Sequence, residues 1–179
     1  MAGVLLVIVA VVVPLAALLH ERAGTVRMSE RHHSHHDTYV VPASFTRSIT
    51  IAMLFMSALG LVLALFCRLH VLHAQPLAVL GFCDAFVVTC FVMQWALCRY
   101  RVSTFRDCMA VTPFLGHEVW VRYDQIDRLV WSGLRMESGF RTLDVWVGGR
   151  RAVRLRGIVD VEQIIMSVDR FDLLPRTTE

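Results

Sequence analysis

Hydrophobic residues form three long runs along the chain, followed by a region in which short apolar runs alternate with arginines and turn residues. Residues 2–19 carry no charge, and as a helix they extend about 27 Å, close to a bilayer core of about 30 Å. The other two runs cover about residues 49–67 and 76–98, with only 68–75 between them. The pattern predicts three transmembrane helices, of which the last two form a hairpin.

A cleaved signal peptide is the alternative to a membrane anchor for the first run, because Ala16 and Ala17 are small residues of the kind found at cleavage sites. No arginine or lysine precedes the run, and it is longer than the apolar region of a usual signal peptide. These features favour the anchor. Pro14 removes one backbone donor from the predicted helix, a defect that membrane helices tolerate.

After Arg99 the pattern changes to that of an antiparallel sheet closed by one amphipathic helix. Strands are predicted at 100–105, 108–112, 117–122, 126–131, 141–147 and 151–156. Asp160 is a predicted N-cap with Gln163 three residues later, as in a capping box. The apolar face of the helix that follows consists of Val161, Ile164, Ile165, Val168 and Phe171.

The alternation within the last predicted hairpin selects a register. Val145 is expected opposite Val153, and Leu143 opposite Leu155, which leaves residues 148–150 as a three-residue loop. A two-residue turn at 148–149 is rejected, because it would place Leu143 opposite an arginine. The chosen register puts Asp144 opposite Arg154 as an exposed pair on the outer face.

Arginines indicate how the helices are oriented in the membrane. They occur in the first loop and directly after the third run, whereas residues 68–75 contain only one. The positive-inside rule therefore predicts a cell-membrane protein with its N-terminus outside and its C-terminal domain cytoplasmic. The predicted organisation is a first transmembrane helix at 1–20, a cytoplasmic His-rich loop at 21–47, a transmembrane hairpin at 48–98, a cytoplasmic β domain at 99–173 and a tail at 174–179.

Composition supports a membrane protein and excludes several functional classes. The 179 residues are 56% hydrophobic, and the net charge of +3 is carried without any lysine, which gives no indication of nucleic-acid binding. The five cysteines form no CxxC pair and suggest neither a disulfide framework nor a zinc site. A phosphate-binding Gly-rich loop, HExxH and GxSxG are all missing from the sequence. We therefore expect no enzymatic activity and no cofactor.

The densest group of candidate metal ligands lies in the predicted first loop. His32, His33, His35 and His36 precede Asp37, and neutral imidazole is a good ligand for zinc, copper or nickel. Consecutive loop residues converge on one ion only at an ordering cost, so a solvated loop is an alternative reading. A third reading is a pH response, because histidines titrate near 6.5.

Asp84 is the only acidic residue inside a predicted span. An unpaired carboxylate near the bilayer centre would cost roughly 2.5 to 3.5 kcal/mol, so such a residue is a functional-site hypothesis by default. The alternative is a protonated or partly hydrated carboxyl group packed inside the bundle. Ion or proton conduction usually needs several polar groups in the membrane, and few are available here.

Three segments carry a resemblance to a known family. They are the strand 100–104 leading to a second strand that ends at 110–112, the strand 119–123 leading into 124–129, and the late hairpin with its terminal helix. Together, over residues 99–172, they resemble the bacterial pleckstrin-homology-like (PH-like) domains that follow membrane helices in small, often uncharacterised membrane proteins. The resemblance implies a small, mainly antiparallel PH-like barrel with a C-terminal α-helix, and a noncatalytic role in protein interaction, assembly or membrane-surface contact.

The expected function is therefore that of a noncatalytic membrane protein with a cytoplasmic interaction or regulatory module. Its expected partners are the lipid bilayer and another membrane or cytoplasmic protein. Anionic lipid head groups are a further possible partner, through the basic cluster Arg150, Arg151, Arg154 and Arg156. The alternative function is a small transport or metal-responsive component that uses Asp84 and the His32 to His36 loop.

Overall fold

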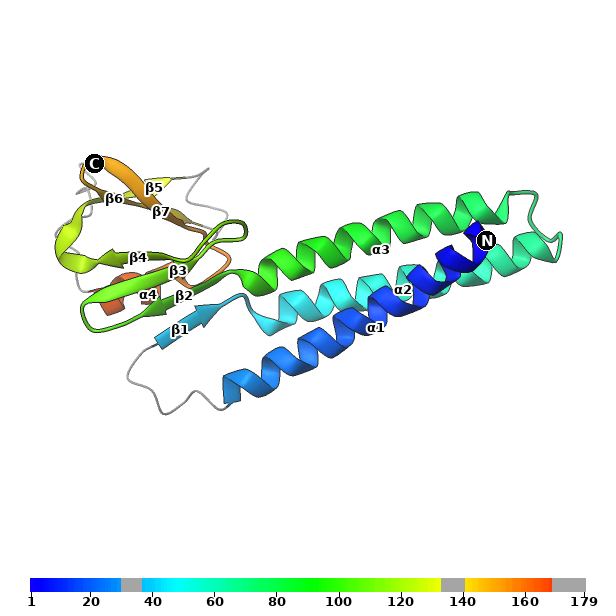
Figure 1. Cartoon of the computed structure of the whole chain (residues 1–179), viewed down its shortest axis with the longest axis horizontal. Coiled ribbons are helices and arrows are strands. Elements are labelled where there is room, and N and C mark those ends of the chain that lie inside the picture. The colour runs from blue at the N-terminus through cyan, green and yellow to red at the C-terminus, as the bar shows by residue number, and fades with distance from the viewer. Residues whose placement is uncertain (30–36, 133–140, 169–179) are drawn as a thin grey trace. The chain divides into compact units, whose positions relative to one another are not determined.

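A computed structural model of the chain describes residues 1–29, 37–132 and 141–168, without the side chains of 22–29 and 167. The chain divides into two compact units. The helical unit contains α1 (Ala2–Ser29), α2 (Ala43–Arg68) and α3 (Pro76–Arg99) (Figure 1). The β unit combines the segment around residues 33–42 with the chain from Cys98 onward.

All three helices are long and apolar enough to cross a membrane, over Ala2–Glu21, Ala43–Arg68 and Pro76–Arg99. This agrees with the three predicted runs. The helices extend beyond the predicted boundaries, however, because α1 continues to Ser29 and α2 begins at Ala43. The segment 21–47, predicted to be a loop, is therefore partly helical.

The buried face of α2 repeats every three or four residues, as expected for a helix packed along one side. Gly60 lies on this face beside α3, where a Cβ atom at Gly60 would approach the Cβ of Cys83 to 2.7 Å. Real Cβ atoms do not come this close, so only glycine permits the contact at this point.

Pro14 lies in the interior of α1, and the helix continues through it. Proline has no backbone N–H, so the carbonyl of Ala10, four residues earlier, loses its usual helical donor. The Ser57 hydroxyl of α2 donates a hydrogen bond to this carbonyl instead. A side chain of the neighbouring helix thus replaces the bond that Pro14 removes.

The first sheet is antiparallel and has the strand order β1-β2-β3-β4. Its strands are β1 (Asp37–Val40), β2 (Arg101–Thr104), β3 (Cys108–Thr112) and β4 (Val119–Arg122). The sequence analysis did not predict β1, which comes from the chain between α1 and α2. It pairs with β2, with Asp37 opposite Thr104 and Val40 opposite Arg101.

A short 3₁₀ turn, η1 (Tyr123–Gln125), leads from the first sheet to the second. The second sheet has the order β5-β6-β7, with β5 (Ile126–Ser132), β6 (Thr142–Val147) and β7 (Arg150–Leu155). The Tyr123 hydroxyl donates to the Phe105 carbonyl at 3.0 Å. Burial raises the pKa of Tyr123 to about 12, so this hydroxyl keeps its proton.

The β6–β7 hairpin confirms the predicted register and corrects the predicted turn. Leu143 lies opposite Leu155 and Val145 opposite Val153, but Val147 pairs with Arg150, so the turn has two residues. Gly148 and Gly149 have φ of 58° and 72°, the left-handed values that a tight hairpin turn needs. A β-bulge between Val145 and Trp146 absorbs the extra residue and restores the register.

The C-terminal helix α4 (Val161–Val168) follows the second sheet. The Asp160 carboxylate accepts a hydrogen bond from the Gln163 backbone N–H at 3.1 Å, which confirms the predicted N-cap. Four of the five residues predicted for its apolar face, Val161, Ile164, Ile165 and Val168, are buried; Phe171 lies outside the described residues. The described strands form two sheets and not the closed barrel that the resemblance implied.

Candidate functional site

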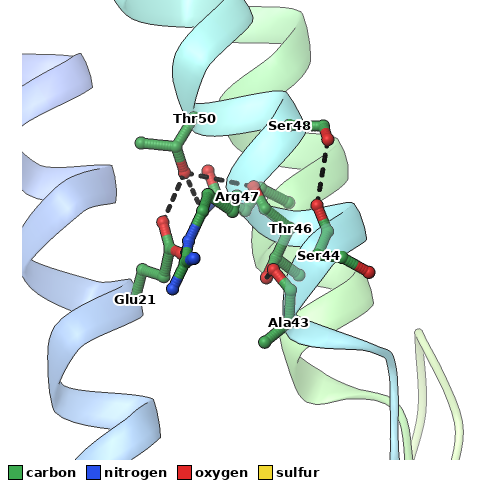
Figure 2. A network of polar contacts seen from close by, with 8 residues as sticks. Glu21, Ala43, Ser44, Thr46, Arg47, Ser48 and Thr50 are labelled. Carbon is green, nitrogen blue, oxygen red and sulfur yellow. Dashed lines mark hydrogen bonds and ion pairs between the residues drawn. The ribbon is translucent and has the colours of Figure 1, made fainter.

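Thr50 is the centre of a polar network that connects all three helices of the helical unit. Its hydroxyl lies 2.9 Å from the Glu21 carboxylate of α1, and it accepts a hydrogen bond from the Gln94 side-chain amide of α3 at 2.9 Å. Figure 2 shows Thr50 and Glu21 facing each other, with Arg47 beside them. The network therefore lies between helices that are otherwise largely apolar.

The Thr50 hydroxyl has two acceptors for its single proton. One is the Glu21 carboxylate, and the other is the Thr46 carbonyl of its own helix, at 3.2 Å. A hydroxyl donates only one hydrogen bond at a time but can accept two. The bond to Glu21 joins α2 to α1, whereas the bond to the Thr46 carbonyl stays within α2.

Arg47 partly neutralises Glu21, because its guanidinium lies 3.6 Å from the carboxylate. The Glu21 side chain is only 12% exposed, while that of Arg47 is 66% exposed, so the acid is the more buried partner of this ion pair. Gln94 is also buried, and its side-chain oxygen has no hydrogen-bond partner within the described part of the chain. The network thus contains one unused buried acceptor.

Asp84 lies on α3 next to Cys83, at the point where Gly60 brings α2 close. It is buried, and neither of its carboxylate oxygens has a hydrogen-bond partner among the described residues. Arg68, His70 and His73 lie at the end of α2 and in the chain before α3, and the structure gives no ion pair between them and Asp84. A buried carboxyl group without a hydrogen-bond partner is costly inside a membrane span, so Asp84 is a candidate for a functional role.

The histidine cluster His32, His33, His35 and His36 lies outside the described residues. Its neighbour Asp37 is exposed at the start of β1, and its backbone carbonyl accepts a hydrogen bond from the Thr104 hydroxyl at 3.3 Å. Over residues 1–29, 37–132 and 141–168, the His, Cys, Asp and Glu side chains form no group of three that could hold a metal ion.

The arginines of the predicted basic cluster at β7 differ in their contacts. Arg154 donates two hydrogen bonds to the buried Asp144 carboxylate, at 2.7 and 3.0 Å, and Arg151 lies 3.9 Å from it. The hydrogen bond from Arg154 is the main reason why the pKa of Asp144 is lowered, and burial opposes that effect. Asp144 was predicted to be exposed, but the structure buries it.

Arg156 belongs to a different cluster, around Tyr100 at the start of the β unit. Its guanidinium lies 5.0 Å from the centre of the Phe114 ring, and its backbone N–H donates to the Tyr100 hydroxyl at 2.9 Å. Tyr100 stacks on Phe114, with ring centres 4.7 Å apart. Arg150 is exposed on β7, opposite Val147. The four arginines are therefore divided among three environments.

The sequence analysis missed the Thr50 network because it assigned Glu21 to a loop. One available signal was the position of two charged residues. Glu21 follows the first apolar run, and Arg47 precedes the second. In antiparallel neighbouring helices, the end of one run lies beside the start of the next, so these opposite charges were candidates for a pair.

Comparison with known proteins adds no identification. The chain matches no protein-family model, no curated protein and no solved structure. Functional inference therefore rests on the geometry of its own residues.

Proposed function

We propose that the protein is a noncatalytic integral membrane protein whose β unit is a PH-like interaction module at the cytoplasmic face of the membrane. The observation that carries this proposal is the pairing of β1 with β2. One strand precedes the α2–α3 hairpin and the other follows it. The membrane hairpin is thus inserted between two neighbouring strands of the module.

This pairing has a direct consequence for topology if the three helices cross the bilayer. Strands on opposite sides of a membrane cannot pair, so the chain between α1 and α2 and the chain after α3 lie on the same side. Three spans satisfy this requirement, and they place the N-terminus and residues 68–75 on the other side. The distribution of arginines supports a cytoplasmic location for the module.

The PH-like assignment is supported by the order of elements. Four antiparallel strands are followed by three antiparallel strands and a C-terminal helix. With β1 counted, the described residues of the module form seven strands, and a small PH-like barrel is expected to have about six or seven. The membrane hairpin would then occupy the connection between its first and second strands.

An exposed aromatic side chain offers a surface for a protein partner. Trp120 lies on β4, the edge strand of the first sheet, and is 59% exposed. It stacks on Phe105 with ring centres 5.3 Å apart, so its orientation is fixed. Rigid aromatic side chains of this kind frequently dominate the binding energy of protein interfaces.

The pairing can be tested in native membranes by an engineered disulfide. Thr38 and Ser103 are opposite each other in β1 and β2, with hydroxyl oxygens 3.2 Å apart. With Cys108 replaced by serine, we expect Thr38→Cys and Ser103→Cys to form a disulfide on mild oxidation. The bond would hold the two halves of the chain together after cleavage at a protease site inserted within residues 70–75.

Thr38→Cys combined with Ala110→Cys is the matched control, because Ala110 lies one strand further away, opposite Ser103. No cross-link is expected from that pair. Equal cross-linking in the two variants would contradict the pairing.

The protein partner can be tested by photo-cross-linking. A photoreactive residue at position 120 should give a discrete protein adduct in cells, and one at the exposed position 106 should not. Identical patterns at both positions would contradict an interaction surface at β4.

Proton or cation movement is a second candidate function, favoured by the two unpartnered oxygens of Asp84. Flux measured in proteoliposomes should then fall to the lipid background in Asp84→Asn. Cys83→Ala, one residue away on the same helix, serves as the control. Flux that is unaffected by Asp84→Asn would exclude Asp84 from any conduction path.

A further inference from the structure

We propose that the β3–β4 turn, residues 113–118, inserts the side chain of Leu115 into the interface of the bilayer that α3 spans. The neighbouring arginines would contact anionic lipid head groups. This inference rests on the proposed function, because it requires α3 to cross the membrane and the module to follow it directly. It identifies a lipid-contacting surface different from the β7 arginines.

The turn is held next to the residues where α3 ends. Arg99 is the last residue of α3, and its guanidinium donates a hydrogen bond to the Gly116 carbonyl at 2.6 Å. Tyr100 follows at once and stacks on Phe114. Gly116 of the turn is thus bonded to Arg99, and Phe114 of the turn is packed on Tyr100. If α3 leaves the bilayer at Arg99, the turn lies no further from this exit point than the length of the Arg99 side chain.

The side chain at the tip of the turn is apolar and exposed. Leu115 is 76% exposed, more than Met166 at 62% and Trp120 at 59%, the other strongly exposed large hydrophobic residues of the described β unit. Phe114 is held between Tyr100 and Arg156, so it forms the base of the turn. Gly116 has φ of 107°, which directs the chain back toward β4 after Leu115.

The charges around the turn suit an anionic membrane surface. Arg99, Arg101 and Arg156 each contact a residue of the turn, and the contact of Arg101 is to the acid Glu118, at 3.8 Å. Basic side chains close to an anionic leaflet strengthen membrane binding. An exposed apolar side chain close to basic residues combines buried apolar area with attraction to anionic lipids, the two contributions that bind a segment to a membrane surface. The β7 arginines fit less well, because Asp144 already engages Arg151 and Arg154.

A protein partner or a second copy of the chain could also cover Leu115. The hydrogen bond from Arg99 favours lipid, because it ties the turn to the end of a membrane-spanning helix and not to a distant face of the module. The experiment below distinguishes lipid from a protein partner or a second copy of the chain.

The experiment uses the full chain with a small fluorescent amino acid at position 115, and in a second variant at position 166 as the matched exposed control. Both are reconstituted into vesicles of phosphatidylethanolamine and phosphatidylglycerol that contain lipids brominated near the head-group end of the acyl chains. We expect several-fold stronger quenching at position 115 than at 166. We also expect the quenching at 115 to weaken in vesicles of phosphatidylcholine alone.

Equal quenching at the two positions, strong or absent, would overturn the inference. Weak lipid quenching at 115 together with protection from aqueous iodide would show a protein at the turn, and would also overturn it. The β1–β2 disulfide reports on topology independently. A disulfide that forms while position 115 is not quenched would therefore refute the lipid contact and leave the proposed function intact.

Discussion

In the β unit the buried carboxylate of Asp144 receives two hydrogen bonds from Arg154, whereas in the helical unit the buried carboxyl group of Asp84 has no partner among the described residues. The difference extends to neutral groups. Thr50 is bonded to two other helices, yet the side-chain oxygen of Gln94 in the same network is unused. Within the described β unit, the indole N–H of Trp146 is the one buried side-chain polar atom without a partner.

This contrast separates two roles of buried polar groups. In the β unit, an ion pair completes a sheet whose backbone bonds already define the fold. In the helical unit, the helices satisfy their own backbones except at the Ala10 carbonyl, so the few side-chain bonds between helices specify how the helices pack. A polar group that makes no such bond, as at Asp84, lowers stability and calls for a functional explanation.

The largest effect is expected from removing the unpartnered carboxyl group. Asp84→Leu should stabilise the helical unit by about 3 kcal/mol, the scale of the cost of an acidic residue at the centre of a span. Helix loss during titration with a denaturing detergent, followed by circular dichroism, measures this change. Asp84→Asn keeps a polar group and should give a smaller gain. A loss of stability in Asp84→Leu would show that the carboxyl group has a stabilising partner.

Removing the partnered carboxylate should have the opposite sign. Asp144→Asn loses charge-assisted hydrogen bonds and should destabilise the β unit by about 2 kcal/mol at neutral pH. Because the pKa of Asp144 is lowered in the folded state, its contribution is present above the ordinary aspartate pKa of about 4 and disappears as the pH falls through the lowered value. Unfolding midpoints can be measured by tryptophan fluorescence as a function of pH. The difference in midpoint between the wild-type protein and Asp144→Asn should shrink as the pH falls.

Asp124→Asn is the matched control for Asp144. Its carboxylate is 61% exposed and pairs with Arg122 at 2.8 Å, and exposed pairs contribute at most about 1 kcal/mol. An equal loss in the two variants would remove the distinction between a buried and an exposed pair in this unit.

The close approach of α2 and α3 should depend on one glycine. Gly60→Ala places a Cβ atom 2.7 Å from that of Cys83, and we expect a loss of about 1.5 kcal/mol from overpacking. Gly81→Ala is the control, because its Cβ would have no atom within 4 Å. Adding Cys83→Gly to Gly60→Ala should recover part of the loss in the same detergent titration. Equal effects of the two alanine variants would contradict the packing argument.

The three-helix network should have a smaller effect. Thr50→Val keeps the shape of the side chain but leaves Gln94 without its acceptor and Glu21 without its donor, and should cost about 1 kcal/mol. Ser48→Ala removes only a hydrogen bond to the Ser44 carbonyl of its own exposed turn, so it should change little. If Ser48→Ala is as damaging as Thr50→Val, the bonds between helices have no special importance.

The smallest expected effect concerns the replacement bond at Ala10. Ser57→Ala should cost about 0.6 kcal/mol, the average for a hydrogen bond between membrane helices. Pro14→Ala restores the N–H that α1 lacks, so Ser57→Ala should cost almost nothing in that background. A double-mutant cycle with the four proteins measures this coupling. Additive effects would show that the Ser57 hydroxyl does not substitute for the missing N–H.

The elements that the sequence predicted are those whose signals are local. The three apolar runs, the Asp160 cap and the alternation of Leu143 and Val145 each reflect contacts within a short segment or between neighbouring strands. The β6–β7 turn was wrong by one residue, because a bulge can restore a register that a two-residue turn would otherwise break.

β1 illustrates what the sequence could not reveal. It has four residues, and its partner strand lies beyond the entire α2–α3 hairpin, so no local pattern marks it as a strand. The polar network was hidden for a similar reason. Glu21, Thr50 and Gln94 belong to three helices, and hydrophobicity alone does not determine how helices are rotated about their axes.

The insertion of the hairpin between β1 and β2 also sets the order in which the protein can fold. The hydrogen bond from the Thr104 hydroxyl to the Asp37 carbonyl joins residues 67 positions apart. During synthesis, β1 is made first and has no partner until both helices of the hairpin have followed. Such long-range pairing is slow, and an unpaired strand edge is prone to aggregation. If α2 and α3 cross a membrane, incorrect insertion of this hairpin would leave β1 and β2 on opposite sides, and the sheet could be completed only after correct insertion.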